Sequence, residues 1–171
     1  SHKLAYVNLY AHIDLELIPF GNVEVKNASS SSSSNGSLLE FDCQHGEDEC
    51  YGNRVQACLI EHVQNNTNES MRFVRCMFER FNLNIKRSAS RCFRDTTFSQ
   101  LISWRAIEHC VNGVQGYRLM ERNYRRDESL TPSKEYVPWV VINGRNFTDW
   151  NTGKLQKFLC ETYLVDQDIP V

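Results

Sequence analysis

The chain has 171 residues, which is enough for one domain with a buried core. Its 19 Lys and Arg residues are balanced by 21 Asp and Glu residues, and the net charge of −2 excludes the strong basic excess of proteins that bind nucleic acid or anionic membranes by charge. No apolar stretch approaches the roughly 20 residues that a membrane-spanning helix needs, so we predict neither a nucleic-acid partner nor a membrane span.

The N-terminal part of the chain predicts one helix, two strands and a loop. Residues 3–11 carry apolar side chains at helical spacing, and residues 13–20 at first alternate between apolar and polar side chains, as a strand does. Residues 26–37 are rich in Ser, Asn and Gly, a composition that cannot bury apolar area, and they predict a surface loop. Residues 38–42 predict a second, short strand.

A block of helices follows the second strand. Apolar side chains recur at helical spacing over about 47–65, 69–81, 97–109 and 114–125. Three acidic residues open the first of these segments, where they interact favourably with the helix dipole.

The C-terminal part of the chain predicts a hairpin and a helix. Residues 136–144 are rich in β-forming side chains and end in Asn-Gly, the strongest short hairpin signal. The final predicted helix covers about 152–164. Strands on both sides of a helical block predict an α/β fold interrupted by a helical insertion at about 46–126, within a single domain of residues 1–171.

Cysteine content and sequons indicate the secretory pathway. The sequence contains 7 cysteines and 5 Asn-x-Ser/Thr sequons, which suits an oxidising compartment in which disulfides form and asparagines are glycosylated. We therefore predict a secreted or lysosomal glycoprotein. Because the chain opens on Ser1 and carries no signal peptide, we take it as a processed or trimmed form. The sequons begin at Asn27, Asn35, Asn65, Asn68 and Asn146.

The most specific segment of the sequence is residues 43–58, which read CQHGEDECYGNRVQAC. It resembles the signature of the gamma-interferon-inducible lysosomal thiol reductase (GILT) family, C-Q-H-G-x-x-E-C-x-x-N-x-x-x-x-C. Residues 18–22 (IPFGN) and 136–139 (YVPW) agree with the same family. Every fixed position of the signature is filled, by Cys43, Gln44, His45, Gly46, Glu49, Cys50, Asn53 and Cys58.

The resemblance implies a thioredoxin-like fold with an inserted, disulfide-linked helical subdomain. Members of the family are soluble glycoproteins that reduce protein disulfides, using a C-x-x-C pair placed where the first strand meets the first long helix. The first cysteine attacks and the second resolves the mixed disulfide, helped by the helix N-terminus that stabilises a thiolate. This sequence contains no C-x-x-C, and the resemblance places the first strand, the pair and the start of the helix upstream of Ser1.

Two functional hypotheses follow from this departure. The first is a non-catalytic, protein-binding role on the thiol-reductase scaffold, with no catalytic residue, cofactor or metal in this sequence and a role in host defence or antigen processing. The alternative is a thiol oxidoreductase whose C-x-x-C lies in a segment upstream of Ser1. The protein partner is not identified by the sequence, and the chain is expected to be a monomer or a disulfide-linked dimer.

The remaining cysteines are interpreted as structural. Predicted helices joined by a turn suggest a bridge between Cys58 and Cys76, and local loops suggest bridges Cys92–Cys110 and Cys43–Cys50, although spacing leaves other pairings open. Cys160 is then left over. It is buried and free, pairs with another chain, or pairs with a cysteine upstream; a catalytic role has no neighbouring base or thiol in the sequence to support it.

Polar residues of the signature are expected to serve structure. Gln44, His45, Glu49 and Asn53 would hydrogen-bond the turn that enters the first inserted helix. A metal site made of Cys43, His45 and Cys50 would match no standard zinc spacing.

Two further segments are candidates for binding. The resemblance places Val137–Pro138 at the cis-proline position of thioredoxin-like folds, where the backbone meets an extended peptide, and only X-Pro bonds adopt the cis form at low cost. Basic residues gathered in the insertion would suit an acidic protein partner if they do not simply form a solvated helix face. They are Arg72, Arg75, Arg80, Lys86, Arg87, Arg91 and Arg94.

Overall fold

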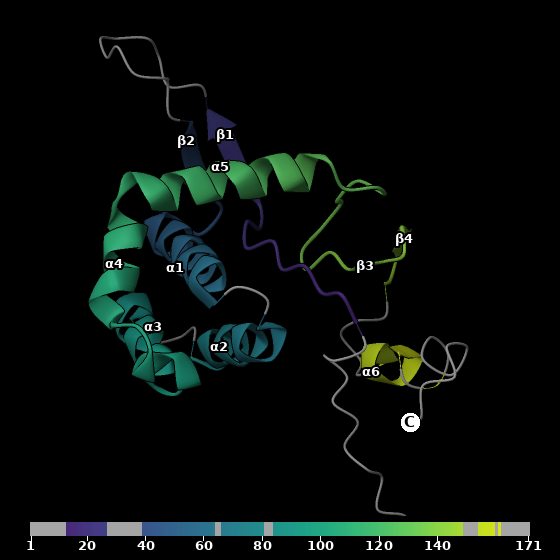
Figure 1. Ribbon diagram of the computed structural model, residues 1–171. Coiled ribbons are helices and arrows are strands. Elements are labelled where there is room, and N and C mark those ends of the chain that lie inside the picture. Colours follow the sequence, from purple (N-terminus) through teal and green to yellow (C-terminus); the bar gives the residue numbers. More distant parts are fainter. Residues whose placement is uncertain are drawn as a thin grey trace, which may run out of the picture. The chain divides into compact units, whose positions relative to one another are not determined.

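The computed structural model describes residues 13–26, 39–63, 66–80, 84–148, 154–159 and 161 (Figure 1). The chain divides into two compact units, of which one is Leu17–Ser129 and the other combines Ser1–Glu16 with Leu130–Val171. The described residues form a helix-rich α/β structure with two small sheets and three disulfides. None of the described helices is both long and apolar enough to cross a bilayer.

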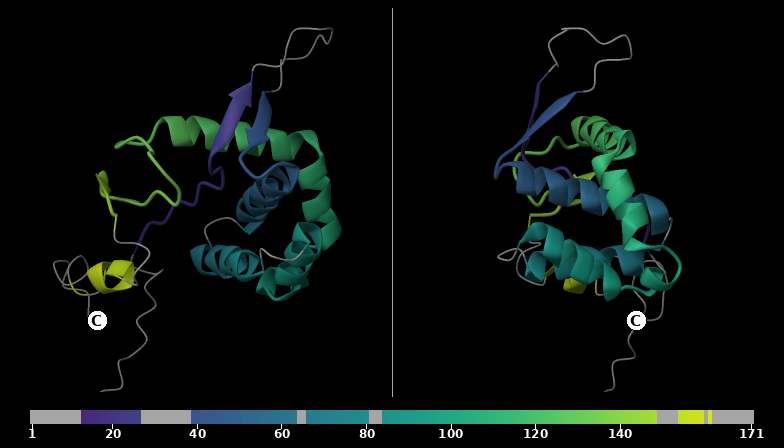
Figure 2. Two further views of the ribbon diagram at one scale, coloured as in Figure 1. Left: turned by 180° about the vertical axis from the view of Figure 1, so that it is seen from behind. Right: turned by 90° about the vertical axis from the view of Figure 1, so that its left-hand side faces the viewer.

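Helix α1 is the centre of the unit Leu17–Ser129, and helices α2 to α5 pack around it (Figures 1 and 2). Their inward faces form one apolar core, whose fully buried members include Leu59 of α1, Phe73 of α2 and Ile107 of α4. The helical elements are α1 (Glu47–Val63), α2 (Thr67–Glu79), α3 (Ile85–Arg94), the 3₁₀ helix η2 (Thr97–Gln100), α4 (Trp104–Asn112) and α5 (Val114–Glu128).

Short polar side chains set where several of these helices begin. Asn66, Asn84 and Ser103 precede α2, α3 and α4, and each side-chain oxygen accepts a hydrogen bond from a backbone N–H three residues on. The predicted helices at 47–65, 69–81 and 114–125 correspond to α1, α2 and α5. The single helix predicted over 97–109 is wrong, because η2 ends at Gln100 and α4 begins after the Ser103 cap.

Helix α3 was not predicted by apolar periodicity. Its sequence, IKRSASRCFR, buries small side chains (Ser88 and Ala89) beside Cys92 and Phe93, so few large apolar residues mark its inner face. This omission explains the error in disulfide pairing. The sequence pattern predicts no helix at Cys92, so it does not suggest Cys92 as the partner of Cys76.

Three disulfides brace this unit. Cys43–Cys50 connects the end of strand β2 to the first turn of α1, as predicted. Cys58–Cys110 joins α1 to α4, and Cys76–Cys92 joins α2 to α3, with Cα–Cα distances of 6.0 and 5.7 Å. The expected bridges Cys58–Cys76 and Cys92–Cys110 are therefore wrong, because the α1 cysteine faces α4, and α2 pairs with the unpredicted α3.

Strands β1 (Val23–Lys26) and β2 (Glu40–Cys43) form an antiparallel pair in which Val23 lies opposite Cys43. The Lys26 ammonium lies 2.7 Å from the Asp42 carboxylate, and this hydrogen bond raises the pKa of Lys26. The strand predicted over 13–20 is wrong, since residues 13–18 join no sheet of the described residues and the chain pairs only after the turn at Pro19. The predicted helix at 3–11 and all but Lys26 of the predicted loop lie outside the described residues.

The other unit contains the predicted Asn-Gly hairpin. Strands β3 (Val141–Ile142) and β4 (Arg145–Asn146) pair through Asn143 and Gly144, which have φ of 49° and 77°, as a type I′ turn requires. Helix α6 (Lys154–Phe158) lies within the predicted range 152–164, and the Phe147 and Phe158 rings have centroids 5.1 Å apart.

Candidate functional site

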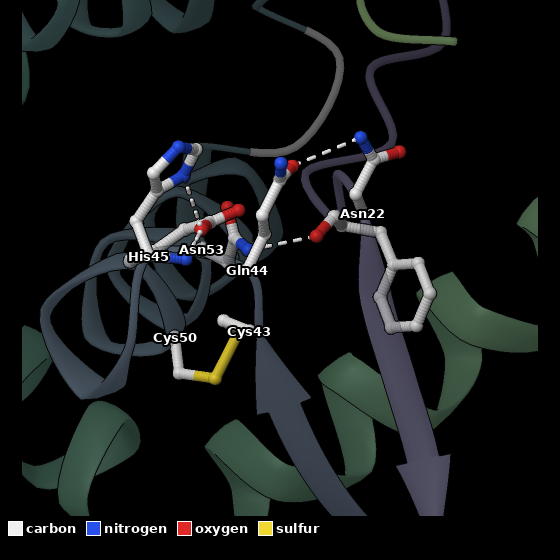
Figure 3. Close-up of polar contacts among 8 residues, drawn as sticks. Asn22, Cys43, Gln44, His45, Cys50 and Asn53 are labelled. Carbon is white, nitrogen blue, oxygen red and sulfur yellow. Dashed lines mark hydrogen bonds and ion pairs between the residues drawn. A yellow bond between two sulfur atoms is a disulfide. The ribbon is translucent and has the colours of Figure 1, made fainter.

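The signature segment lies where strand β2 passes into helix α1 (Figure 3). Gly46 makes the bend, with a φ of 83° that favours glycine, and its N–H donates to the Cys43 carbonyl at 2.9 Å. The Gly46 carbonyl then accepts from the N–H groups of Glu49 and Cys50. Residues 43–50 therefore form a compact turn closed by backbone hydrogen bonds and by the Cys43–Cys50 disulfide.

This turn holds a second segment, residues 19–22, which we call the Pro19–Asn22 turn. The Gln44 N–H donates to the Asn22 carbonyl at 3.2 Å, and the Asn22 side-chain amide donates to Gln44 Oε1 at 3.0 Å (Figure 3). The Asn53 amide, one turn into α1, donates to the Phe20 carbonyl at 2.8 Å. Phe20 is buried, and a buried backbone carbonyl without a partner is costly, so the bond from Asn53 fixes the path of the turn.

Glu49 closes the same cluster. Its Oε2 accepts a hydrogen bond from the His45 N–H at 2.7 Å and lies 2.9 Å from His45 Nδ1. Gly21 has a φ of 76°, and a Cβ atom at that position would lie 3.1 Å from Glu49 Oε1. Gly21 therefore serves both the left-handed turn and the close approach of the Glu49 side chain.

An aromatic anchor completes the arrangement. Phe20 is 3% exposed, and its ring lies 6.0 Å from Phe41 of β2 and 5.8 Å from Tyr124 of α5. From α5, the Asn123 amide donates to the Pro19 carbonyl at 3.0 Å. The Pro19–Asn22 turn is thus fastened to β2, α1 and α5 together.

The cysteines of the signature are bonded and buried. Cys43 is 4% exposed and Cys50 2%, while Cys58 is fully buried in its bridge to α4. A bridged sulfur is neither a thiolate nucleophile nor a metal ligand. Within the part of the chain that the structure describes, no group of three His, Cys, Asp or Glu side chains is placed to hold a metal ion. Cys160 lies outside the described residues.

The other predicted sites lie apart from this cluster in the sequence. The Val137–Pro138 peptide bond is cis, and Tyr136 and Val137 are 36% and 43% exposed. Trp139 packs against Tyr136 and donates its indole N–H to the Pro132 carbonyl at 3.1 Å.

Two of the five sequons fall in described positions. Asn68 is exposed in the first turn of α2. Asn146 is on β4, and its buried Oδ1 accepts no hydrogen bond from the described residues. Asn27, Asn35 and Asn65 lie outside the described residues.

One contact residue, Asn123, has no signal in the sequence. It lies 104 residues from its partner Pro19 and in a helix whose outward face is polar. Asn22 and Gly21 belong to the IPFGN segment, but their contacts with Gln44 and Glu49 join residues more than 20 positions apart.

Fold and site together define a disulfide-braced, helix-rich α/β protein in which a cysteine-rich signature clamps a neighbouring turn. Residues 2–96 match the family model described as "Gamma interferon inducible lysosomal thiol reductase (GILT)". The match covers more than half of the chain, and the chain belongs to this family.

Curated relatives agree with the family model. The chain is 31% identical to a gamma-interferon-inducible lysosomal thiol reductase of Carassius auratus, over 92% of this chain and 59% of that protein. It is 30% identical to the protein of the same name in Mus musculus, over 88% of this chain and 55% of that one. A gamma-interferon-inducible lysosomal thiol reductase-like protein of Anopheles gambiae is 32% identical, over 78% of this chain and 55% of that protein. The chain therefore spans a little over half the length of these relatives.

Proposed function

We propose that this chain is a non-catalytic, protein-binding member of the GILT family. The observation that carries the proposal is that all six cysteines of the described residues are paired in disulfides that brace the helical unit. Thiol–disulfide exchange needs a thiolate with access to its substrate, and bridges between cysteines that are buried, or partly buried in the case of Cys76, do not supply one. The sequence given also contains no C-x-x-C pair.

The same architecture supports a binding role. Three disulfides and the clamp on the Pro19–Asn22 turn restrict the helical unit to one arrangement, and a preorganised surface loses little conformational entropy when a partner binds. We further propose that residues of about 46–126 are an insertion in a thioredoxin-like domain spanning 1–171, and that the exposed edge at Val137–Pro138 contacts an extended peptide. The exposure of Tyr136 and Val137 supports the latter.

We place the protein in the secretory pathway, as a secreted or lysosomal glycoprotein with a role in host defence. Three disulfides support an oxidising compartment, and the names of the Carassius auratus and Mus musculus relatives include the word lysosomal. The exposed Asn68 is the described sequon that best suits a glycan, because the acceptor side chain is open to solvent.

An insulin-reduction assay at acid and neutral pH tests the proposal. With dithiothreitol as the electron donor, the chain is expected to leave the rate of insulin precipitation at the uncatalysed level, because its described sulfurs are bridged and, except for that of the partly buried Cys76, belong to buried residues. A full-length family enzyme with a C-x-x-C pair serves as the positive control. Turnover by this chain comparable with that control would refute the proposed role.

A second candidate is a thiol oxidoreductase whose reactive pair lies upstream of Ser1. The observation that favours it is that relatives named thiol reductases extend well beyond the part that this chain covers. Reading the open reading frame upstream of Ser1 decides between the candidates. A strand followed by C-x-x-C in that frame supports the oxidoreductase, and a frame without such a pair rules it out.

A further inference from the structure

Helix α3 carries a row of arginines on its outer face. Arg87, Arg91 and Arg94 are all exposed, and at 100° per residue they fall within about 60° of the helix circumference. The buried side chains of α3 lie on the opposite side, against the core. We call these three residues the arginine stripe.

On the neighbouring helix α2, carboxylate groups balance the charges of the arginines. On α2 and just beyond it, Arg72 pairs with Glu69 at 3.6 Å, Arg75 with Glu79 at 3.4 Å, and Arg80 with Asp95 at 3.8 Å. Helix α3 contains no acidic residue. None of the three stripe arginines is within ion-pair distance of a carboxylate belonging to the described residues. Of the seven basic residues predicted as a patch, Arg72, Arg75 and Arg80 are therefore paired with carboxylates, whereas the three stripe arginines are not paired with a carboxylate of the described residues.

Lys86 is not part of the stripe. It lies about a quarter turn from Arg87, and its ammonium is 5.2 Å from the centre of the Tyr51 ring. Burial raises the pKa of Tyr51, and the negative charge of Glu108 raises it further.

Within the stripe, like charges stand four and three residues apart, spacings at which they repel each other on a helix. A bound anion would relieve that repulsion. The face contains no exposed aromatic or aliphatic side chain between the arginines: Ala89, Cys92 and Phe93 are buried, and residue 90 is a serine. Base stacking requires such side chains, and attraction to an anionic lipid surface is typical of larger clusters of about four to eight basic residues, so single-stranded nucleic acid and a lipid surface fit this face poorly.

We propose that the arginine stripe binds an acidic peptide segment of a protein partner, in an extended conformation. Along the helix axis, Arg87 and Arg91 are about 6 Å apart and Arg91 and Arg94 about 4.5 Å apart. Alternate residues of an extended chain are about 6.6 Å apart and point to the same side. Carboxylates at every second position therefore meet successive guanidinium groups, whose planar forks pair with carboxylates through two hydrogen bonds. The proposal rests on the protein-binding role proposed above and gives the partner its chemistry.

The test is a titration of the full chain against a fluorescent octapeptide of alternating Glu and Ser, followed by fluorescence anisotropy. Binding is expected at low salt and is expected to weaken at about 150 mM salt, where charges are screened over about 8 Å. The matching Gln–Ser peptide is the neutral control. The peptides contain no cysteine, so their binding does not depend on thiol chemistry, and insulin reduction decides the non-catalytic role separately.

Two matched variants locate the site. Arg87→Gln with Arg91→Gln removes two stripe charges, and Arg72→Gln with Arg75→Gln removes two ion-paired, exposed charges from the next helix. The stripe variant is expected to bind the Glu–Ser peptide about tenfold more weakly and the control variant less than about twofold. Unchanged far-ultraviolet circular dichroism shows that both variants are folded.

Three results would overturn the proposal. One is an equal loss of affinity in the two variants. Another is binding of the Gln–Ser peptide as tight as that of the Glu–Ser peptide. The third is tighter binding through Arg87 and Arg91 of heparin, phosphatidylserine vesicles or single-stranded DNA than of the acidic peptide, which would assign the stripe to a different class of ligand.

Discussion

Replacing Cys58 and Cys110 together with alanine is expected to lower the free energy of unfolding by about 4 kcal/mol. The bridge closes a loop with a sequence separation of 52, so its loss frees a long stretch of the unfolded chain. Both residues are fully or almost fully buried, at 0% and 1% exposure, between α1 and α4. Urea denaturation followed by circular dichroism measures the change.

The matched control removes the bridge between α2 and α3. Cys76→Ala with Cys92→Ala opens a loop with a separation of 16 and is expected to cost about 3 kcal/mol. Free thiols counted in the denatured, unreduced chain test the pairing directly. Neither double variant should gain a free thiol over the parent chain, whereas Cys58→Ala with Cys76→Ala should gain two. The opposite pattern would contradict the observed connectivity.

Phe20→Ala is expected to destabilise the protein by about 3–5 kcal/mol. The ring is 3% exposed and packs between Phe41 of β2 and Tyr124 of α5, so its removal leaves a cavity where three segments meet. The Pro19–Asn22 turn would then be held by hydrogen bonds alone. Urea denaturation measures this change also, and loss of protection from hydrogen exchange at the Gln44 N–H reports release of the turn.

Phe78→Ala is the control for this prediction. Phe78 is 67% exposed on α2, and its removal is expected to change the free energy of unfolding by no more than about 0.5 kcal/mol. Similar losses in the two variants would mean that Phe20 does not anchor the turn.

Local signals in the sequence are sufficient to predict the elements that have a strong apolar periodicity or a characteristic turn sequence. The acidic first turn and apolar spacing located α1, and Asn143-Gly144 located the hairpin between β3 and β4. Helix α3 has a weak apolar pattern because the small residues Ser88 and Ala89 make up part of its buried face beside Cys92 and Phe93, and its N-cap Asn84 is not followed three residues later by the Glu or Gln of a capping box. The strand predicted from the alternation at 13–20 is wrong because a strand needs a second strand to pair with, and no local pattern shows whether one is present.

The candidate site shows the same division between local and long-range information. The signature identifies the polar residues of the cluster, and the sequence predicts that they hydrogen-bond the turn that enters the first inserted helix. Their partners are not predicted, because Asn53 contacts the Phe20 carbonyl 33 residues away and Asn123 contacts Pro19 across 104 residues. Disulfide connectivity also depends on long-range packing and not on local sequence, since Cys58 and Cys110 meet only once α4 has packed on α1.

We propose that the signature cysteines brace the fold and take no part in thiol exchange. Limited reduction of the native chain with a phosphine at acid pH, followed by alkylation with N-ethylmaleimide and mass mapping, tests it most directly. Because Cys43 and Cys50 are 4% and 2% exposed, their bridge is expected to stay intact under conditions that fully reduce a thioredoxin C-x-x-C disulfide. Complete alkylation of Cys43 and Cys50 in a chain that keeps its native circular dichroism would contradict the claim.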